Sequence, residues 1–269
     1  AAGATGTMGP QVYPLTAGTL QVEPLYLAWA DGVIEASKDG ELTWNASTAG
    51  ASATCTPPFA PSWGTIWGGD DGHVWMTIDY LATAAVDTGA LDGTVDVTAV
   101  WIHELDTTRA WAGLANGKVY YGVVDTTTPT IAWTLAGTIV AAGQVYRIRE
   151  TLGTLGSLRA TCATGYYGSE DGGATWTLIH TFTSSNALGW LAGFEQNWAS
   201  GHNVSSGAVV YAETGTTPTT PGGVDTLVMT AGWRTQAAYG ADDANPANLY
   251  ATDDTFAAFT DTTINAPAV

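Results

Sequence analysis

Four carboxylates are the residues whose type could hydrolyse a glycosidic bond: Glu104, Asp106, Glu150 and Glu195. That chemistry needs two carboxyl groups about 5 to 10 Å apart, one of which acts as the general acid. A chain with 25 Asp and Glu residues never excludes such a pair, and a single acid is more often a solvated surface group. The sequence therefore assigns no catalytic residue and favours a non-catalytic protein over an enzyme.

Metal and cofactor chemistry finds little support in the spacing of the other candidate ligands. The four histidines (His73, His103, His180, His202) lack the close pairing of zinc ligands. Three Asp-Asp pairs, which begin at Asp70, Asp242 and Asp253, follow no EF-hand spacing. No nucleotide-binding glycine loop and no Gly-x-Ser-x-Gly elbow occurs. We expect no metal site and no cofactor, with a structural calcium ion as the alternative.

One motif occurs twice at a spacing that indicates a repeat. The segment from Ser37 to Trp44 (Ser-Lys-Asp-Gly-Glu-Leu-Thr-Trp) matches the segment from Ser169 to Trp176 (Ser-Glu-Asp-Gly-Gly-Ala-Thr-Trp) without a gap. The offset is 169 − 37 = 132 residues, or three times 44. The ten shared residues, which we assign a structural role, are Ser37, Asp39, Gly40, Thr43, Trp44, Ser169, Asp171, Gly172, Thr175 and Trp176.

These two segments resemble the Asp-box, or BNR, repeat of sialidases, sortilin-like receptors, some plant-wall glucanases and photosystem-assembly propellers. The resemblance implies a hairpin turn between the two outer strands of a propeller blade. The residue types agree with such a turn. Each Asp accepts backbone N–H groups of its own turn, and each Gly adopts backbone angles that a side chain would forbid. Each Trp is expected to begin the next strand and to pack between blades.

A sialidase would require three arginines around the substrate carboxylate, a Tyr-Glu nucleophile pair and an acid/base Asp. The chain has five arginines, and Arg147, Arg149 and Arg159 lie close together in the sequence. No Arg-Ile-Pro signature occurs near the N-terminus. Arg147 and Arg149 are two residues apart, so we expect them on one face of a strand, paired with an acid such as Glu150 or Glu104. The sequence therefore does not carry the sialidase catalytic set.

Short alternating runs rich in aromatic and β-branched residues predict strands. They are residues 25–29, 117–121, 144–148 and 208–211. A weaker copy of the repeat joins residues 120–125 and 133–135, 46 residues before 166–171. Another copy of the repeat is expected around residues 74–89, where the sequence predicts strands but contains no Asp-box motif. Residues 198–203 indicate a long loop beside Glu195, and residues 214–223 a loop between blades.

A period near 44 residues divides 269 about six times. The prediction is one all-β domain over residues 1–269, a β-propeller of six blades, each a four-stranded antiparallel sheet, with five or seven blades as alternatives. Cys55 and Cys162 are too few for a disulfide scaffold, and we expect two separate buried thiols.

The amino-acid composition disfavours some classes of binding partner. Seven Lys and Arg against 25 Asp and Glu give a net charge of −18, which disfavours nucleic acid. No run approaches the roughly 18 apolar residues of a membrane span, so no membrane insertion is expected. The start Ala1-Ala2-Gly3-Ala4 suits a mature protein whose signal segment was removed, or a recombinant start.

Low charge and a surface rich in Thr, Ala, Gly and aromatic residues suit packing between subunits. We expect a structural or interaction subunit of an extracellular, cell-surface or virion assembly, bound to other protein subunits or to copies of itself. The alternatives are a glycan-binding propeller, which would use some of the 12 Trp, and a glycoside hydrolase or lyase.

Overall fold

The protein is described here by a computed structural model. Its backbone is described for residues 4–7, 25–29, 33–37, 44–48, 50, 59–60, 64–103, 106–139, 143–151, 154–182, 190–194, 197–204, 207–212, 227–231, 237–242, 249–253 and 260–261. Side chains are described for residues 33–36, 44–48, 50, 64–103, 106–139, 143–151 and 154–182. Within these ranges the regular structure is entirely β, as the sequence predicts, and no helix is long and apolar enough to cross a membrane. The chain divides into two compact units, Ala1–Ala136 and Gly137–Val269.

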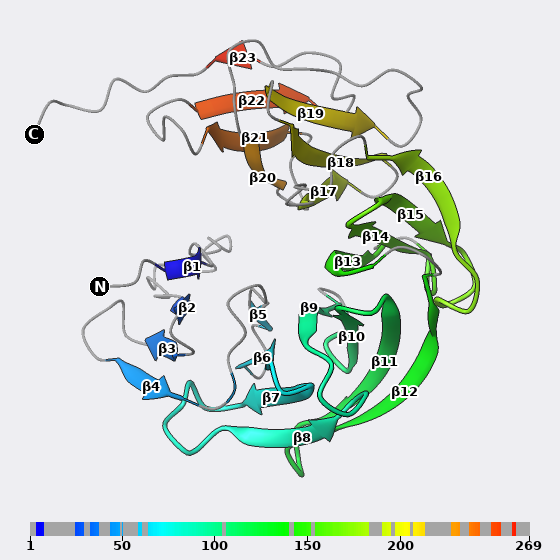
Figure 1. The fold of residues 1–269 in the computed structure, drawn as a ribbon. Coiled ribbons are helices and arrows are strands. Elements are labelled where there is room, and N and C mark those ends of the chain that lie inside the picture. The colour runs from blue at the N-terminus through cyan, green and yellow to red at the C-terminus, as the bar shows by residue number, and fades with distance from the viewer. Residues whose placement is uncertain are drawn as a thin grey trace, which may run out of the picture. The chain divides into compact units, whose positions relative to one another are not determined.

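The first unit contains three antiparallel sheets among its described strands, and each sheet is built from four strands that follow one another in the chain (Figure 1). The first sheet is β1 (Ala4–Thr7), β2 (Leu25–Trp29), β3 (Ile34–Ser37) and β4 (Asn45–Ser47). The second is β5 (Phe59–Ala60), β6 (Gly64–Gly68), β7 (His73–Thr77) and β8 (Val86–Ala90). The third is β9 (Val97–Ile102), β10 (Arg109–Leu114), β11 (Lys118–Asp125) and β12 (Thr130–Thr138), which ends two residues past the boundary of the unit.

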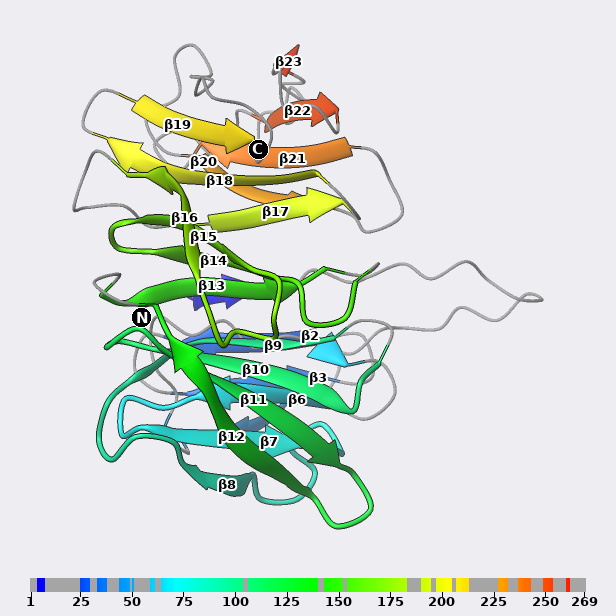
Figure 2. The ribbon, with the colours of Figure 1, turned by 90° about the vertical axis from the view of Figure 1, so that its right-hand side faces the viewer.

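The second unit contains three further antiparallel sheets of consecutive strands, two with four described strands and one with three (Figure 2). The first is β13 (Val145–Glu150), β14 (Leu158–Cys162), β15 (Gly165–Ser169) and β16 (Thr177–Thr181). The next is β17 (Trp190–Phe194), β18 (Asn197–Val204) and β19 (Gly207–Ala212). The last is β20 (Leu227–Ala231), β21 (Ala237–Asp242), β22 (Leu249–Asp253) and β23 (Thr260–Asp261).

Neighbouring sheets of the first unit pack through their inner strands. β6 contacts β9, and the core between them buries apolar side chains of β6, β7, β9 and β10, among them Ile66, Met76, Val97, Ile102 and Leu114. A second cluster joins the first two sheets: Ile34, Ala36, Trp67 and Leu81. A fully buried apolar side chain contributes roughly 1.5–3 kcal/mol, so these two clusters hold the three sheets together.

In the second unit β13 and β14 contact β17, and β17 and β18 contact β20, so the inner strands again carry the packing. The described core of the first of these sheets includes Val145, Ile148, Leu158, Ala160 and Tyr166.

Most strand predictions agree with the observed strands, and one loop prediction is wrong. Residues 25–29 form β2, and residues 208–211 lie within β19. The predicted runs 117–121 and 144–148 each begin one residue before the observed strands β11 and β13. Residues 198–203, expected as a loop, lie within β18, which pairs with both β17 and β19. The Gly and Ser residues of this segment suggested a loop, but hydrogen bonds from neighbours on both sides outweigh that local preference. The predicted loop 214–223 lies outside the described residues.

Candidate functional site

Ser169 and Asp171 organise the turn between β15 and β16. The Ser169 hydroxyl donates to Asp171 Oδ1 at 2.9 Å and accepts the N–H of Gly173 at 2.9 Å. Asp171 in turn accepts the Thr175 N–H at 2.9 Å and its hydroxyl at 2.6 Å. The Trp176 indole closes the segment by donating to the Gly173 carbonyl. We refer to residues 169–176 as the Ser169 turn.

Backbone conformation and electrostatics both depend on these bonds. Gly172 and Gly173 have φ values of +72° and +85°, a region that favours glycine. The hydrogen bonds from Thr175 come first among the causes that lower the pKa of Asp171 to about 2. Because its lone pairs are engaged within the turn, Asp171 acts here as a structural acceptor.

A second turn with a similar pattern of hydrogen bonds lies between β7 and β8, where the sequence showed no motif. The Thr77 hydroxyl donates to Asp79 Oδ1 at 3.2 Å and accepts the Leu81 N–H at 2.9 Å. Asp79 Oδ2 accepts the Thr83 N–H at 3.0 Å. Tyr80 and Leu81 have φ values of +59° and +61°, although neither is glycine. We refer to residues 77–84 as the Thr77 turn.

The residues of the two turns correspond position by position in the sequence. Their hydroxyl, acid and second threonine stand at positions 1, 3 and 7, and the two residues of positive φ stand at positions 4 and 5. The signal in the sequence was the spacing of the acids: Asp79, Asp125 and Asp171 lie 46 residues apart. Thr77 in place of Ser, Tyr80 in place of Gly and Ala84 in place of Trp concealed the motif.

The remaining repeat positions are described only in part. Asp39, Gly40 and Thr43 lie outside the described residues, as does the side chain of Ser37. Trp44 directly precedes β4, as Trp176 precedes β16, and is 37% exposed. The third acid of the series, Asp125, ends β11 and accepts the N–H groups of the two residues at 127 and 128.

A recess of about 290 Å³ opens beside the Ser169 turn. It is lined by Arg159, Gly168, Ser169, Glu170, Asp171, Thr175, Thr177 and Ile179. The Arg159 side chain is 9% exposed, and its Nη1 lies 2.8 Å from Glu170 Oε1. The same nitrogen donates to the Leu158 carbonyl and the Ser157 hydroxyl. A guanidinium, two carboxylates and three hydroxyls therefore line one small space. Two of the hydroxyls, those of Ser169 and Thr175, donate to Asp171 within the turn.

The arginines of this sheet are arranged as their spacing indicates. Arg147 and Arg149 flank the buried Ile148 on β13, which places both on the opposite face from that residue. Arg149 lies directly across from Arg159 on β14. Glu150 is completely buried and accepts the Gly156 N–H at 2.6 Å. The expected pairing of these arginines with Glu150 or Glu104 stays a prediction, and Glu104 lies outside the described residues.

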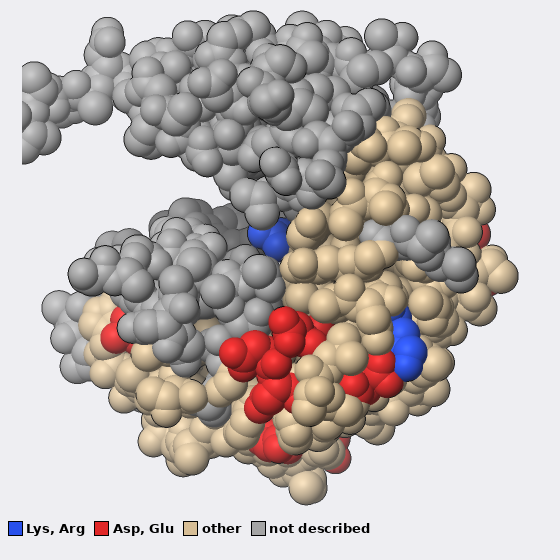
Figure 3. Space-filling model, viewed as in Figure 1, with Lys and Arg blue, Asp and Glu red and all other residues tan. Residues whose placement is uncertain are grey.

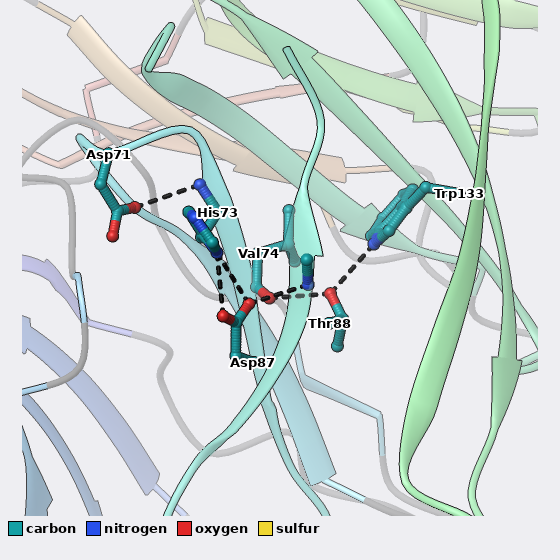
Figure 4. A network of polar contacts seen from close by, with 7 residues as sticks. Asp71, His73, Val74, Asp87, Thr88 and Trp133 are labelled. Carbon is teal, nitrogen blue, oxygen red and sulfur yellow. Dashed lines mark hydrogen bonds and ion pairs between the residues drawn. The ribbon is translucent and has the colours of Figure 1, made fainter. Parts of the chain in front are cut away.

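Figure 4 shows a polar network that joins two sheets of the first unit. The Trp133 indole of β12 donates to the Thr88 hydroxyl at 3.0 Å, which donates to the Val74 carbonyl at 2.7 Å. Beside it, both carboxylate oxygens of Asp87 lie 2.9 Å from His73 Nδ1. The hydrogen bond to Asp87 is the largest cause that raises the pKa of His73. This network fixes the outer strands β7, β8 and β12 to one another.

Acidic side chains gather on one face of the first unit (Figure 3). The turn at Asp70 and Asp71 meets the loop that holds Asp92 and Asp96, because the Val97 N–H donates to the Gly69 carbonyl. Lys118 lies 2.7 Å from Asp92, which lowers the pKa of that acid. Among the residues with described side chains, no group of three or more His, Cys, Asp or Glu is placed to hold a metal ion. The structural calcium ion stays a prediction.

The four carboxylates considered for hydrolysis divide between the two units. Asp106 accepts the Thr108 hydroxyl at 2.6 Å, which lowers its pKa, and its own N–H donates to His103 Nδ1. Glu150 lies in the second unit and Glu195 outside the described residues. The two described acids each bind their own loop, which is a local structural role.

No family model matches the sequence, and no curated protein matches it. Solved structures are similar in fold. The chain aligns with the structure of U3-55K at 9% identity and a TM-score of 0.62, covering 86% of this chain and 73% of that one. The dihydro-heme d1 dehydrogenase NirN aligns at 12% identity and 0.57, covering 90% and 55%. An ancestral GH74 enzyme, whose fold is a propeller, aligns at 11% identity and 0.63, covering 93% and 37%. Identities this low establish similarity of fold alone.

Proposed function

We propose that the chain is a six-bladed β-propeller in which each antiparallel sheet is one blade. The sheets follow the chain without crossing, and within each unit they contact one another through their inner strands. The likeness to the GH74 enzyme supports the same architecture. The Ser169 and Thr77 turns, between the third and fourth strands of their sheets, are then Asp-box turns, and the sequence of residues 37–44 predicts a third.

Within that architecture the protein acts as a non-catalytic structural or interaction subunit of an extracellular, cell-surface or virion assembly. One observation carries the proposal: the outermost strands of two sheets expose leucine at the same repeat position. Leu135 of β12 and Leu178 of β16 each follow a Trp-Thr pair and are 48% and 47% exposed. Neither strand carries Asp, Glu, Lys or Arg. Uncharged outer strands with exposed apolar side chains suit contacts with further protein subunits.

The native mass tests this proposal. Sedimentation or mass photometry of the protein from its source should reveal an assembly many times larger than 27.8 kDa. A replacement of Leu135 or Leu178 by Ser should weaken that assembly, whereas the same change at Leu155, which is 66% exposed but lies in a loop before β14, should not. A 27.8 kDa monomer under native conditions would refute the subunit role.

The recess beside Arg159 favours a second function, glycan binding, because sugars present many hydroxyls to charged and hydroxyl side chains. Titration of an oligosaccharide panel, followed by NMR, would detect shifts of Thr175 and Thr177 amides on binding. Thr177→Val should weaken the interaction, with Thr181→Val on the same strand as the matched control. Release of reducing sugar in the same samples would instead indicate the hydrolase alternative.

A further inference from the structure

Among the described strands, β12 pairs with β11 alone and forms a long sheet edge. It has nine residues and is the terminal strand of its sheet, along the outside of β11 (Figures 1 and 2). The terminal strands β8 and β16 have five residues each. A terminal strand presents a row of unpaired backbone N–H and C=O groups, and natural proteins protect long ones with charges, proline or a bulge. The sequence of β12, Thr-Ile-Ala-Trp-Thr-Leu-Ala-Gly-Thr, contains no charge and no proline.

The surroundings of this edge point to a second copy of the chain as its occupant. Any partner copy carries the same net charge of −18, so two copies approach best where charges are absent. No charged residue occurs between Asp125 and Arg147, a stretch that includes all of β12 and both of its flanks. The acidic face of the first unit lies on other loops, at residues 70–71 and 92–96.

The strand is also complementary to itself. In an antiparallel pair of two β12 strands, the register that pairs all nine residues places Thr134 opposite Thr134 of the partner subunit. Trp133 then lies opposite Leu135, Ala132 opposite Ala136, and Thr130 opposite Thr138. Thr–Thr pairs and aromatic–aliphatic pairs are favourable across antiparallel strands. Leu135, exposed in one copy, gains an apolar neighbour in this register.

The described contacts of β12 with other sheets involve side-chain positions. The Trp133 indole donates to the Thr88 hydroxyl of β8, and a Cβ at Gly137 would meet the Gly173 carbonyl. Side chains of a strand project from its faces, whereas pairing uses the backbone groups in the plane of the sheet.

We propose that two copies of the chain associate through antiparallel pairing of their β12 strands about a two-fold axis at Thr134, which gives a continuous eight-stranded sheet. The inference rests on the proposed role as a subunit, and it names a specific contact within the assembly. A two-fold contact of this kind uses the same patch on both subunits and closes on itself.

Cysteine cross-linking tests the register. Opposite residues of an antiparallel pair have Cα atoms about 4.5 to 5.5 Å apart, within the range of a disulfide. Thr134→Cys, made with Cys55 replaced by Ser, should give a covalent dimer under mild oxidation. Ala132→Cys, the matched control two residues away, should give no covalent dimer, because residue 136 of the partner subunit lies opposite it in the β12–β12 pair. The native Cys162 is buried and does not interfere.

A charge test on the full chain complements the cross-link. Thr134→Lys changes the net charge only from −18 to −17 but places two like charges opposite each other, and should weaken dimerisation severalfold by sedimentation equilibrium. Leu155→Lys makes the same change of charge at an exposed loop residue before β14 and should leave dimerisation unchanged.

The outcomes separate the two proposals. If the assembly persists in Thr134→Lys and no cross-link forms at residue 134, the proposed β12–β12 pairing is wrong, but the subunit role is not contradicted. A wild-type chain that stays at 27.8 kDa at every concentration overturns both.

Discussion

The hydroxyl of Thr77 offers the sharpest test of the equivalence between the Thr77 and Ser169 turns. Thr77 is 3% exposed, and its hydroxyl makes three hydrogen bonds: it donates to the Asp79 carboxylate and accepts the Leu81 N–H at 2.9 Å and, at 3.4 Å, the Asp79 N–H. Thr77→Val keeps the branched shape but removes all three. Losing the bond to Asp79 costs about 1 kcal/mol, and leaving the Leu81 N–H unpaired costs about 1–3 kcal/mol, so the free energy of unfolding should fall by about 2–4 kcal/mol.

Thr77→Ser is the matched control, because it keeps these hydrogen bonds and loses one buried methyl group, which costs about 1 kcal/mol. Calorimetric melting should place the Val variant about 4–16 °C below the wild type and the Ser variant only about 2–4 °C below. Ser169→Ala, which removes the equivalent hydrogen bonds, should behave like Thr77→Val.

Amide hydrogen exchange supplies a local readout of the same change. In Thr77→Val the Leu81 amide should exchange faster, whereas the Gly173 amide, bonded to Ser169 in the other unit, should keep its rate. Melting within about 1 °C of the wild type, together with a Leu81 amide that stays protected, would refute the structural role assigned to the Thr77 hydroxyl.

Three further predictions concern titratable groups. The pKa of His73 is raised by its hydrogen bond to Asp87. The stability from this bond should therefore be fully present below pH 6.5 and lost as the pH rises through the folded-state pKa. An NMR titration in which Asp87→Asn leaves the pKa of His73 unchanged would contradict the pairing. Asp171, with a pKa of about 2 against 3.8, should contribute stability above pH 3.8 that is lost as the pH falls toward 2, and Thr175→Val should raise its pKa in a carboxyl NMR titration. Burial raises the pKa of the Cys162 thiol, so a thiol reagent should modify it only after unfolding, and rapid labelling of the native protein would show that the site is open.

The local features of this protein could be read from its sequence. Alternating apolar residues identified β2 at its observed bounds, and the Ser-x-Asp-Gly spacing identified the turn at Ser169. Both depend on neighbours within a few residues, where backbone preference and side-chain hydrogen bonding act directly. The repeat spacing likewise follows from the sequence, because each sheet is built from consecutive strands.

Contacts between distant residues were decided by the tertiary structure. The motif at Thr77 could not be recognised from residue types, since Tyr80 and Leu81 take the positive φ values that glycine usually supplies. They keep that conformation because the Thr77 hydroxyl binds the Leu81 N–H and Leu81 packs against Ile34 and Trp67. The pairing of Arg159 with Glu170 depends likewise on strand register, which places Gly168, with no side chain, under the guanidinium. The sequence by itself determined the strands, the turns and their period, because the energetics of these features are local. Packing between segments far apart in the chain decided which side chains meet across strands and sheets.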